Sequence, residues 1–158
     1  MRAGRRLRTV FAAALALGAA AAARAGEPVA VMVSGFTAAP GWEASARALT
    51  EAVREALAER PGVVVVTPEE AEALAAAVSL PAQPCGGVDE TCGEAFGRML
   101  GAARLVTGRV GPGAGGMAVE ARMTDLDSGA ETARVETVCA GPRACGRRIA
   151  EALGAGGG

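Results

Sequence analysis

Cysteines are the residues best able to do chemistry in this chain of 158 amino acids. Their spacings are C-x6-C and C-x5-C, at Cys85, Cys92, Cys139 and Cys145. Structural zinc sites favour closer pairs, and redox motifs use C-x-x-C. A reactive thiol would need a histidine or lysine beside it to lower its pKa, and the chain contains neither. Disulfides are therefore the expected state in an oxidising compartment.

The spacing alone leaves the disulfide pairing open, because four cysteines allow three connectivities. Two local pairs, Cys85–Cys92 and Cys139–Cys145, are the favoured arrangement. Each would join a connection rich in proline and glycine to the helix that is expected after it. Short loops remove little chain entropy, so each bridge is expected to add about 2–3 kcal/mol of stability.

The other motifs do not predict catalysis. The absence of histidine excludes Ser-His-Asp and Cys-His catalysis and histidine-ligated metals. Residues 111–116 match G-x-G-x-x-G, but the alternating residues after them predict a strand, where a dinucleotide site needs a helix. Asp125 and Asp127 flank an expected turn and suit turn capping. We predict no catalytic, cofactor or metal site, and therefore no enzyme.

Two pairs of side chains are predicted to contact a partner or ligand. Phe36 and Trp42 bracket the loop after the first expected strand, and the carboxyl ends of strands line binding crevices in open sheets. Arg147 and Arg148 lie on the last expected helix, where guanidinium groups suit an anion or a partner's carboxylate. Core packing for the aromatic pair, and an ordinary solvated surface for the arginines, are the alternative interpretations.

The first 25 residues have the pattern of an export signal. Four arginines precede an uncharged apolar run, Val10–Ala23, which leads into the small-x-small sequence Ala23-Arg24-Ala25. The run is shorter than the ~20 apolar residues of a membrane span. We predict a signal peptide over residues 1–25, cleaved after Ala25, and a periplasmic or secreted protein with no membrane span after cleavage.

Cleavage would leave an acidic chain. The segment removed carries five of the 16 arginines and none of the 17 acidic residues, so the remaining net charge would be −6. Only 3% of the residues are aromatic. An excess of negative charge and a shortage of stacking side chains count against nucleic acid as a partner. They also count against binding to an anionic membrane surface.

The periodicity of the remaining residues predicts one α/β domain over residues 26–153. Short valine-rich runs and alternating segments indicate strands, and apolar positions three or four apart indicate helices. The element order β-α-β-α-α-β-β-β-α predicts a mixed sheet of about five strands with helices packed on it, followed by a flexible glycine-rich tail over residues 154–158. The expected strands are Pro28–Phe36, Val63–Val66, Arg104–Val110, Met117–Thr124 and Thr132–Cys139, and the expected helices are Trp42–Glu59, Thr67–Val78, one beginning at Asp89, and Arg143–Leu153. The first two strands are expected to be buried, and Met99 is expected on the inner side of the helix that begins at Asp89.

Several segments together resemble a known family. Residues 100–110, LGAARLVTGRV, are similar to the LGA-x-x-LV-x-G-x-V segment of the TolB amino-terminal-domain-like group, which includes CsgG-like and LpoB-like envelope proteins. The alternating strand at Met117–Thr124 and the DLDSG turn at 125–129 resemble the group's D-x-x-T/S-G hairpin. The opening VAVMVSGF, with LTEAVREALAERPGVVVV after it, resembles the group's first strand, helix and second strand.

The resemblance implies an α/β fold in the cell envelope and binding rather than catalysis, because several members act by docking on other envelope proteins. It covers residues 28–153 and carries over no position-matched binding residues. We therefore predict a non-catalytic exported interaction module whose partner is another envelope protein. The alternative is a binder of a small ligand or peptidoglycan fragment at the crevice near Phe36 and Trp42.

Overall fold

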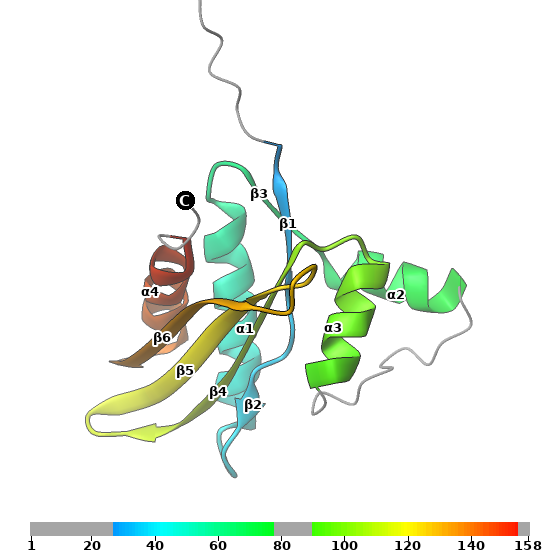
Figure 1. Ribbon diagram of the computed structural model, residues 1–158. Helices are drawn as coiled ribbons and strands as arrows, with labels where there is room; N and C mark the ends of the chain where they lie inside the picture. The colour runs from blue at the N-terminus through cyan, green and yellow to red at the C-terminus, as the bar shows by residue number, and fades with distance from the viewer. Residues whose placement is uncertain (1–26, 78–89, 155–158) are drawn as a thin grey trace, which may run out of the picture.

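The computed structural model describes residues 27–77 and 90–154, which form a mixed sheet with helices packed on it (Figure 1). In chain order the elements are β1 (Val29–Val33), β2 (Thr37–Ala38), α1 (Glu43–Ala58), β3 (Val63–Val65), α2 (Pro68–Ala77), α3 (Glu90–Met99), β4 (Arg104–Gly113), β5 (Gly116–Asp125), β6 (Glu131–Cys139) and α4 (Pro142–Gly154).

The sheet has a parallel half and an antiparallel half. The strand order is β3-β1-β4-β5-β6, and β2 pairs with β4 beside this path. β1 runs parallel to β3 and to β4, while β4, β5 and β6 form an antiparallel meander. The predicted fold class and element order are confirmed. Only β2 was not expected, since two residues carry no detectable period.

One face of the sheet carries the main core. Alternating side chains of β5, from Met117 to Met123, turn towards this face and are buried, because successive residues of a strand point to opposite sides. α1 and α4 pack against each other over it. Their apolar sides contribute Leu49, Val53 and Ile149, each fully buried.

The opposite face is covered at one end only. α3 packs on the first residues of β4, and a smaller cluster forms there around Leu105, Leu126 and Ala102. Arg98 of α3 supports this cluster by donating from Nε to the carbonyl oxygen of Leu126 at 2.6 Å. Beyond it, no helix in residues 27–77 or 90–154 packs on this side of β5 and β6.

Three local expectations were wrong. The valine run at 63–66 was predicted to be a buried strand, but β3 is an edge strand and Val64 is 52% exposed. Met99 was placed on the inner side of α3 and is 50% exposed. Gly154 was assigned to the tail, whereas it is the last residue of α4. For Val64 and Met99 the element was predicted correctly, but the neighbour that would cover the residue is set by the tertiary fold. For Gly154 the helix end was placed one residue too early.

The glycine-rich segment at 111–116 is a hairpin connection, and β5 is the strand that was predicted to follow it. Gly113 of β4 lies opposite Gly116 of β5, so only Ala114 and Gly115 remain in the turn. Gly115 has a φ of 83°, a left-handed conformation that glycine adopts without steric cost. The strand that follows excludes the dinucleotide geometry.

A disulfide joins the end of β6 to the start of α4. Cys139 and Cys145 are bonded, with 5.6 Å between their Cα atoms, and both residues are buried. This confirms one of the two expected pairs. The expected Cys85–Cys92 pair lies outside the described residues because Cys85 falls within 78–89, and so do the expected signal peptide and residues 155–158.

None of the helices in the described ranges combines the length and apolar character that crossing a bilayer requires.

We expect the double substitution Cys139→Ala/Cys145→Ala to lower the free energy of unfolding by about 2 kcal/mol, because the bridge no longer restricts a short loop of the unfolded chain. Urea denaturation of the purified protein measures this. Cys145→Ala alone should cost nearly as much as the double variant, since either change removes the same bond. Single and double losses that simply add would contradict this explanation.

Candidate functional site

The uncovered side of β4, β5 and β6 is an exposed and mostly polar surface, and we call it the open face. Side chains on alternate positions point to it because their neighbours point into the core. The residues of the open face are Thr107, Arg109, Ala118, Glu120, Arg122, Arg134, Glu136 and Val138.

Cross-strand register brings opposite charges together on this face. Arg109 of β4 lies opposite Glu120 of β5, which lies opposite Glu136 of β6. Glu120 forms ion pairs with Arg109 on one side and with Arg134 on the other, the latter at 2.9 Å. The Glu120 side chain is 19% exposed, so one partly buried carboxylate orients two guanidinium groups. This gives the face a fixed pattern of charge.

Arg134 is held most firmly of these groups. It donates to both carboxylate oxygens of Glu131, at 2.9 and 2.7 Å, and to Glu120. Hydrogen bonding to Glu131 is the largest cause that raises the pKa of Arg134, and the same contact lowers the pKa of the Glu131 carboxyl. Both groups are therefore charged throughout the neutral pH range.

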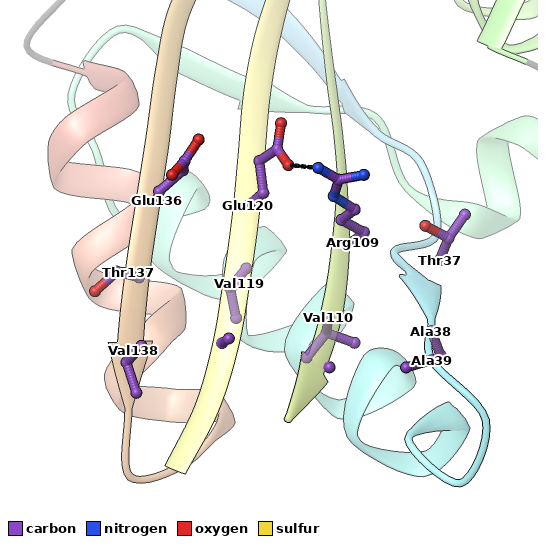
Figure 2. A pocket seen from close by; sticks show the side chains of 12 residues that line it. Thr37, Ala38, Ala39, Arg109, Val110, Val119, Glu120, Glu136, Thr137 and Val138 are labelled. Carbon is purple, nitrogen blue, oxygen red and sulfur yellow. Dashed lines mark ion pairs between the residues drawn. The ribbon is translucent and has the colours of Figure 1, made fainter. Parts of the chain in front are cut away.

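A broad hollow of about 760 Å³ lies between β2 and β6 on this face (Figure 2). Figure 2 shows Thr37, Arg109, Glu120 and Glu136 side by side along its polar end, each from a different strand. The other end is lined by small or apolar groups, including Ala118 and Val138. A polar row beside an apolar floor suits contact with a protein surface better than it suits bond-making chemistry.

A second hollow, of about 430 Å³, lies where β1 ends, and we call it the α1 hollow. It is lined by Gly35, Arg47, Ala48, Thr50, Glu51 and Arg54. Arg54 donates to the carbonyl oxygen of Val33 at 3.1 Å and to Glu51 at 2.5 Å. The buried Nε of Arg54 has no hydrogen-bond partner. This is the carboxyl end of a central parallel strand, where open sheets often bind ligands.

The structure buries Phe36 of the predicted aromatic pair beside Thr50, which lines this hollow, and leaves Trp42 half-buried. Phe36 is 7% exposed, and its ring lies against Gly108 of β4, where any Cβ would collide with it. Its backbone N–H donates to the hydroxyl oxygen of Thr50 at 3.1 Å. Trp42 is half-buried and packs against the main core. Arg47 and Arg54, which the sequence reasoning did not single out, line the hollow instead.

Arg147 and Arg148 are both exposed on α4, close to β6. Arg148 donates to the hydroxyl oxygen of Thr137 at 3.2 Å and to the carbonyl oxygen of Val138 at 3.1 Å. The structure therefore separates the predicted contact residues into two places: the aromatic pair stands where α1 begins, and the arginine pair stands beside the edge of the sheet.

Asp125 has the turn-capping role expected of it. Its carboxylate accepts from the backbone N–H of Ser128 at 2.9 Å and from the Ser128 hydroxyl at 2.7 Å. These two bonds, the backbone one first, lower the pKa of the Asp125 carboxyl. Within residues 27–77 and 90–154 no three acidic, cysteine or histidine side chains are grouped closely enough to hold a metal ion.

The sequence predicts only some features of the open face. Alternation along β5 and β6 indicates which residues face solvent, and it includes Glu120 and Arg134 among them. It does not indicate which residue lies opposite which, because register between strands depends on nonlocal pairing. The ion pairs of Glu120, and the part that β2 plays in the hollow, could not be found that way.

Comparison with known proteins gives a fold but no close relative. No protein-family model and no curated protein matches the chain. Among solved structures, the LpoB C-terminal domain from Salmonella enterica superposes with a TM-score of 0.58 at 14% identity, over 72% of this chain and 83% of that chain. TolB from Acinetobacter baumannii gives a TM-score of 0.54 at 14% identity, over 83% of this chain and 28% of that chain.

A third likeness is to lipoprotein GNA1162 from Neisseria meningitidis, with a TM-score of 0.52 at 16% identity, over 71% of this chain and 80% of that chain. These likenesses confirm that the chain has the TolB-like and LpoB-like fold that its sequence resembles. At such low identity they show the fold alone.

We expect Asp125→Asn to lower the melting temperature at pH 7 and to have no effect in strong acid. A carboxyl with a lowered pKa in the folded state stabilises the fold above its unfolded-state pKa of about 3.9, and the gain is lost as the pH falls through the lower folded value. Thermal unfolding between pH 7 and pH 2 measures this. Asp127→Asn, at an exposed position in the same turn, is the control. A difference between Asp125→Asn and wild type that persists at pH 2 would contradict the prediction.

Proposed function

We propose that the chain is a non-catalytic interaction module of the cell envelope that docks on another envelope protein through the open face. In this proposal the protein is exported, its signal peptide is removed after Ala25, and it works in the periplasm or outside the cell. The single observation that carries the proposal is the open face itself, which holds ordered charges around a hollow of about 760 Å³.

The charges of the open face are held in place by contacts within the protein. Glu120 holds Arg109 and Arg134 in place before any partner arrives, so little side-chain entropy is lost when the face is covered. Fixed charges also select partners, because a like charge brought opposite them costs several kcal/mol. The apolar end of the hollow, near Ala118 and Val138, offers area whose burial supplies affinity.

The composition of the chain and its family resemblance also support a non-catalytic module that binds a protein. The sequence contains no histidine, lysine or tyrosine, the side chains that most often supply general acids and bases beside carboxylates. Its acidic balance after signal removal favours a protein partner over nucleic acid or an anionic lipid surface. The family that the sequence resembles includes members that dock on envelope proteins. Arg147 and Arg148 remain proposed partner contacts at the rim of this surface.

A photo-crosslinking amino acid tests the docking face in the cells that make the protein. Placed at Arg109, whose side chain is 74% exposed on the open face, it should give one crosslinked envelope protein. Placed at Ala44, exposed on the outer side of α1, it should not. Mass spectrometry of the adducts identifies the partner in a single experiment.

Affinity then provides the sharper test. With the crosslinked partner purified, Arg109→Glu should weaken binding about tenfold or more, because it replaces a cation with a further carboxylate beside Glu120. Ala44→Glu, which adds a charge to α1 instead, should leave the affinity unchanged. Crosslinks that arise equally from both positions, or from Ala44 alone, would overturn the open face as the docking site.

A second candidate function is favoured by the α1 hollow. Arg47 is exposed at its mouth, and Arg54 lies deeper beside Glu51, so the hollow is suited to one carboxylate of a small ligand. Peptidoglycan fragments carry such carboxylates. The hollow lies at the end of β1, where the sequence predicted a crevice, but Arg47 and Arg54 line it in place of Phe36 and Trp42.

Fluorescence of Trp42, the chain's one tryptophan, tests this second function by titration with muropeptides. If the ligand binds, the titration should saturate, and Arg47→Ala should weaken binding about tenfold, which is the loss expected when a charge-assisted hydrogen bond is removed. Arg143→Ala, an exposed change on α4, is the matched control. An unchanged fluorescence signal, or equal binding by both variants, would exclude the α1 hollow as a muropeptide site.

A further inference from the structure

β6 is an edge strand nine residues long, and its outer side is unpaired in the described part of the chain. An edge strand presents N–H and C=O groups to which another strand can bond. Natural proteins usually protect an edge strand by keeping it short, by a bulge, or by covering it with a helix or loop. What pairs with β6 is independent of the proposed function.

Two contacts show which backbone groups point off this edge. The carbonyl oxygen of Cys139 lies against Gly116 of β5, so it points into the sheet. The carbonyl oxygen of Val138 accepts from Arg148 of α4 instead of from β5, so it points outwards. The backbone N–H and C=O groups of successive residues in a strand point to alternate sides. Those of Glu136 and Arg134 therefore also point outwards from the edge of the sheet, as those of Val138 do. All three residues are exposed.

We propose that β6 pairs antiparallel with β6 of a second copy of this chain, about a twofold axis through Val135. In this register Arg134 lies opposite the partner's Glu136, and Glu136 lies opposite the partner's Arg134. Both residues direct their N–H and C=O groups outwards, so each such pair closes two backbone hydrogen bonds. The strand is thus complementary to itself in charge as well as in backbone geometry.

Neighbouring registers lack this complementarity. An axis through Arg134 would put that residue opposite its own copy, and an axis through Glu136 would put two carboxylates opposite each other. Like charges directly opposite each other across a strand pair are destabilising. Among registers centred on the middle of β6, only the axis through Val135 sets both Arg134 and Glu136 opposite side chains of opposite charge.

The same register accounts for an exposed apolar side chain. Val138 is 43% exposed, although valine is one of the residue types most often buried. The proposed pairing sets it opposite Thr132 of the second copy, so its exposed area is covered on association. Arg148 binds the carbonyl oxygen of Val138 at the end of this stretch and so marks the limit of the pairing.

Analytical ultracentrifugation of the untruncated protein, purified from the cells that make it, tests the proposal. Wild type should sediment as a monomer–dimer equilibrium. Arg134→Glu and Glu136→Arg should each raise the dimer dissociation constant about tenfold or more, because each places two like-charge pairs in the interface. Mixing the two variants should restore a dimer, since every charge at positions 134 and 136 then faces its opposite.

A covalent test covers the case in which Arg134→Glu, which loses its contacts to Glu131 and Glu120, fails to fold. Val135→Cys places two thiols opposite each other on the axis and should give a dimer on non-reducing gels under mild oxidation. Thr137→Cys, which would face Ala133 of the second copy, should not.

The proposal is overturned by a wild type that remains monomeric up to about 1 mM, the concentration scale of very weak association. It is also overturned by variants that dimerise as wild type does, or by equal crosslinking from positions 135 and 137. Loss of the dimer does not affect the crosslink expected from position 109. Each of the two proposals can therefore be contradicted while the other stands.

Discussion

The close contact between α1 and α4 is the constraint on which the rest of the structure depends. At Gly146 of α4, a Cβ atom would lie 2.7 Å from the backbone carbon and oxygen of Ala52 in α1, a separation that real side chains do not reach. The missing side chain lets the two helices lie side by side over one face of the sheet. Because both cover the same face, β5 and β6 send every second side chain into one core and leave the other half uncovered.

One face of these strands therefore stabilises the fold, and the other is the face that we propose binds a partner. The buried face carries the fully enclosed Leu49, Val53 and Ile149, whose removal from water supplies the main driving force for folding. The open face contributes little to folding, because an ion pair whose guanidinium is exposed, such as Arg109 with Glu120, adds only about 1 kcal/mol. Because these ion pairs add so little stability, the ordered charges of the open face are what we propose a partner contacts.

The sequence predicts the elements of this fold well and their neighbours poorly. Alternation at 117–124 and helical spacing at 43–58 are local properties, and both elements formed where expected. The burial of Phe36 was left open, because a phenylalanine after a strand looks the same whether it meets solvent or a glycine 72 residues later in the chain, as Gly108 is here. The exposure of Val64 was missed for the same reason, since a run of valines does not reveal that its strand is at the edge.

The geometry of one sheet also links the two proposed surfaces. A twofold axis through Val135 that pairs β6 with its copy keeps alternate side chains on the same side of the combined sheet, so the open faces of both copies would point in one direction. Arg109 and its counterpart would then belong to one continuous surface with two equivalent docking sites. Two linked sites bind a repeated or membrane-held partner far more tightly than one, because the second contact forms at a high effective concentration. A module with a weak single face can gain useful affinity in this way without adding any new contact residue.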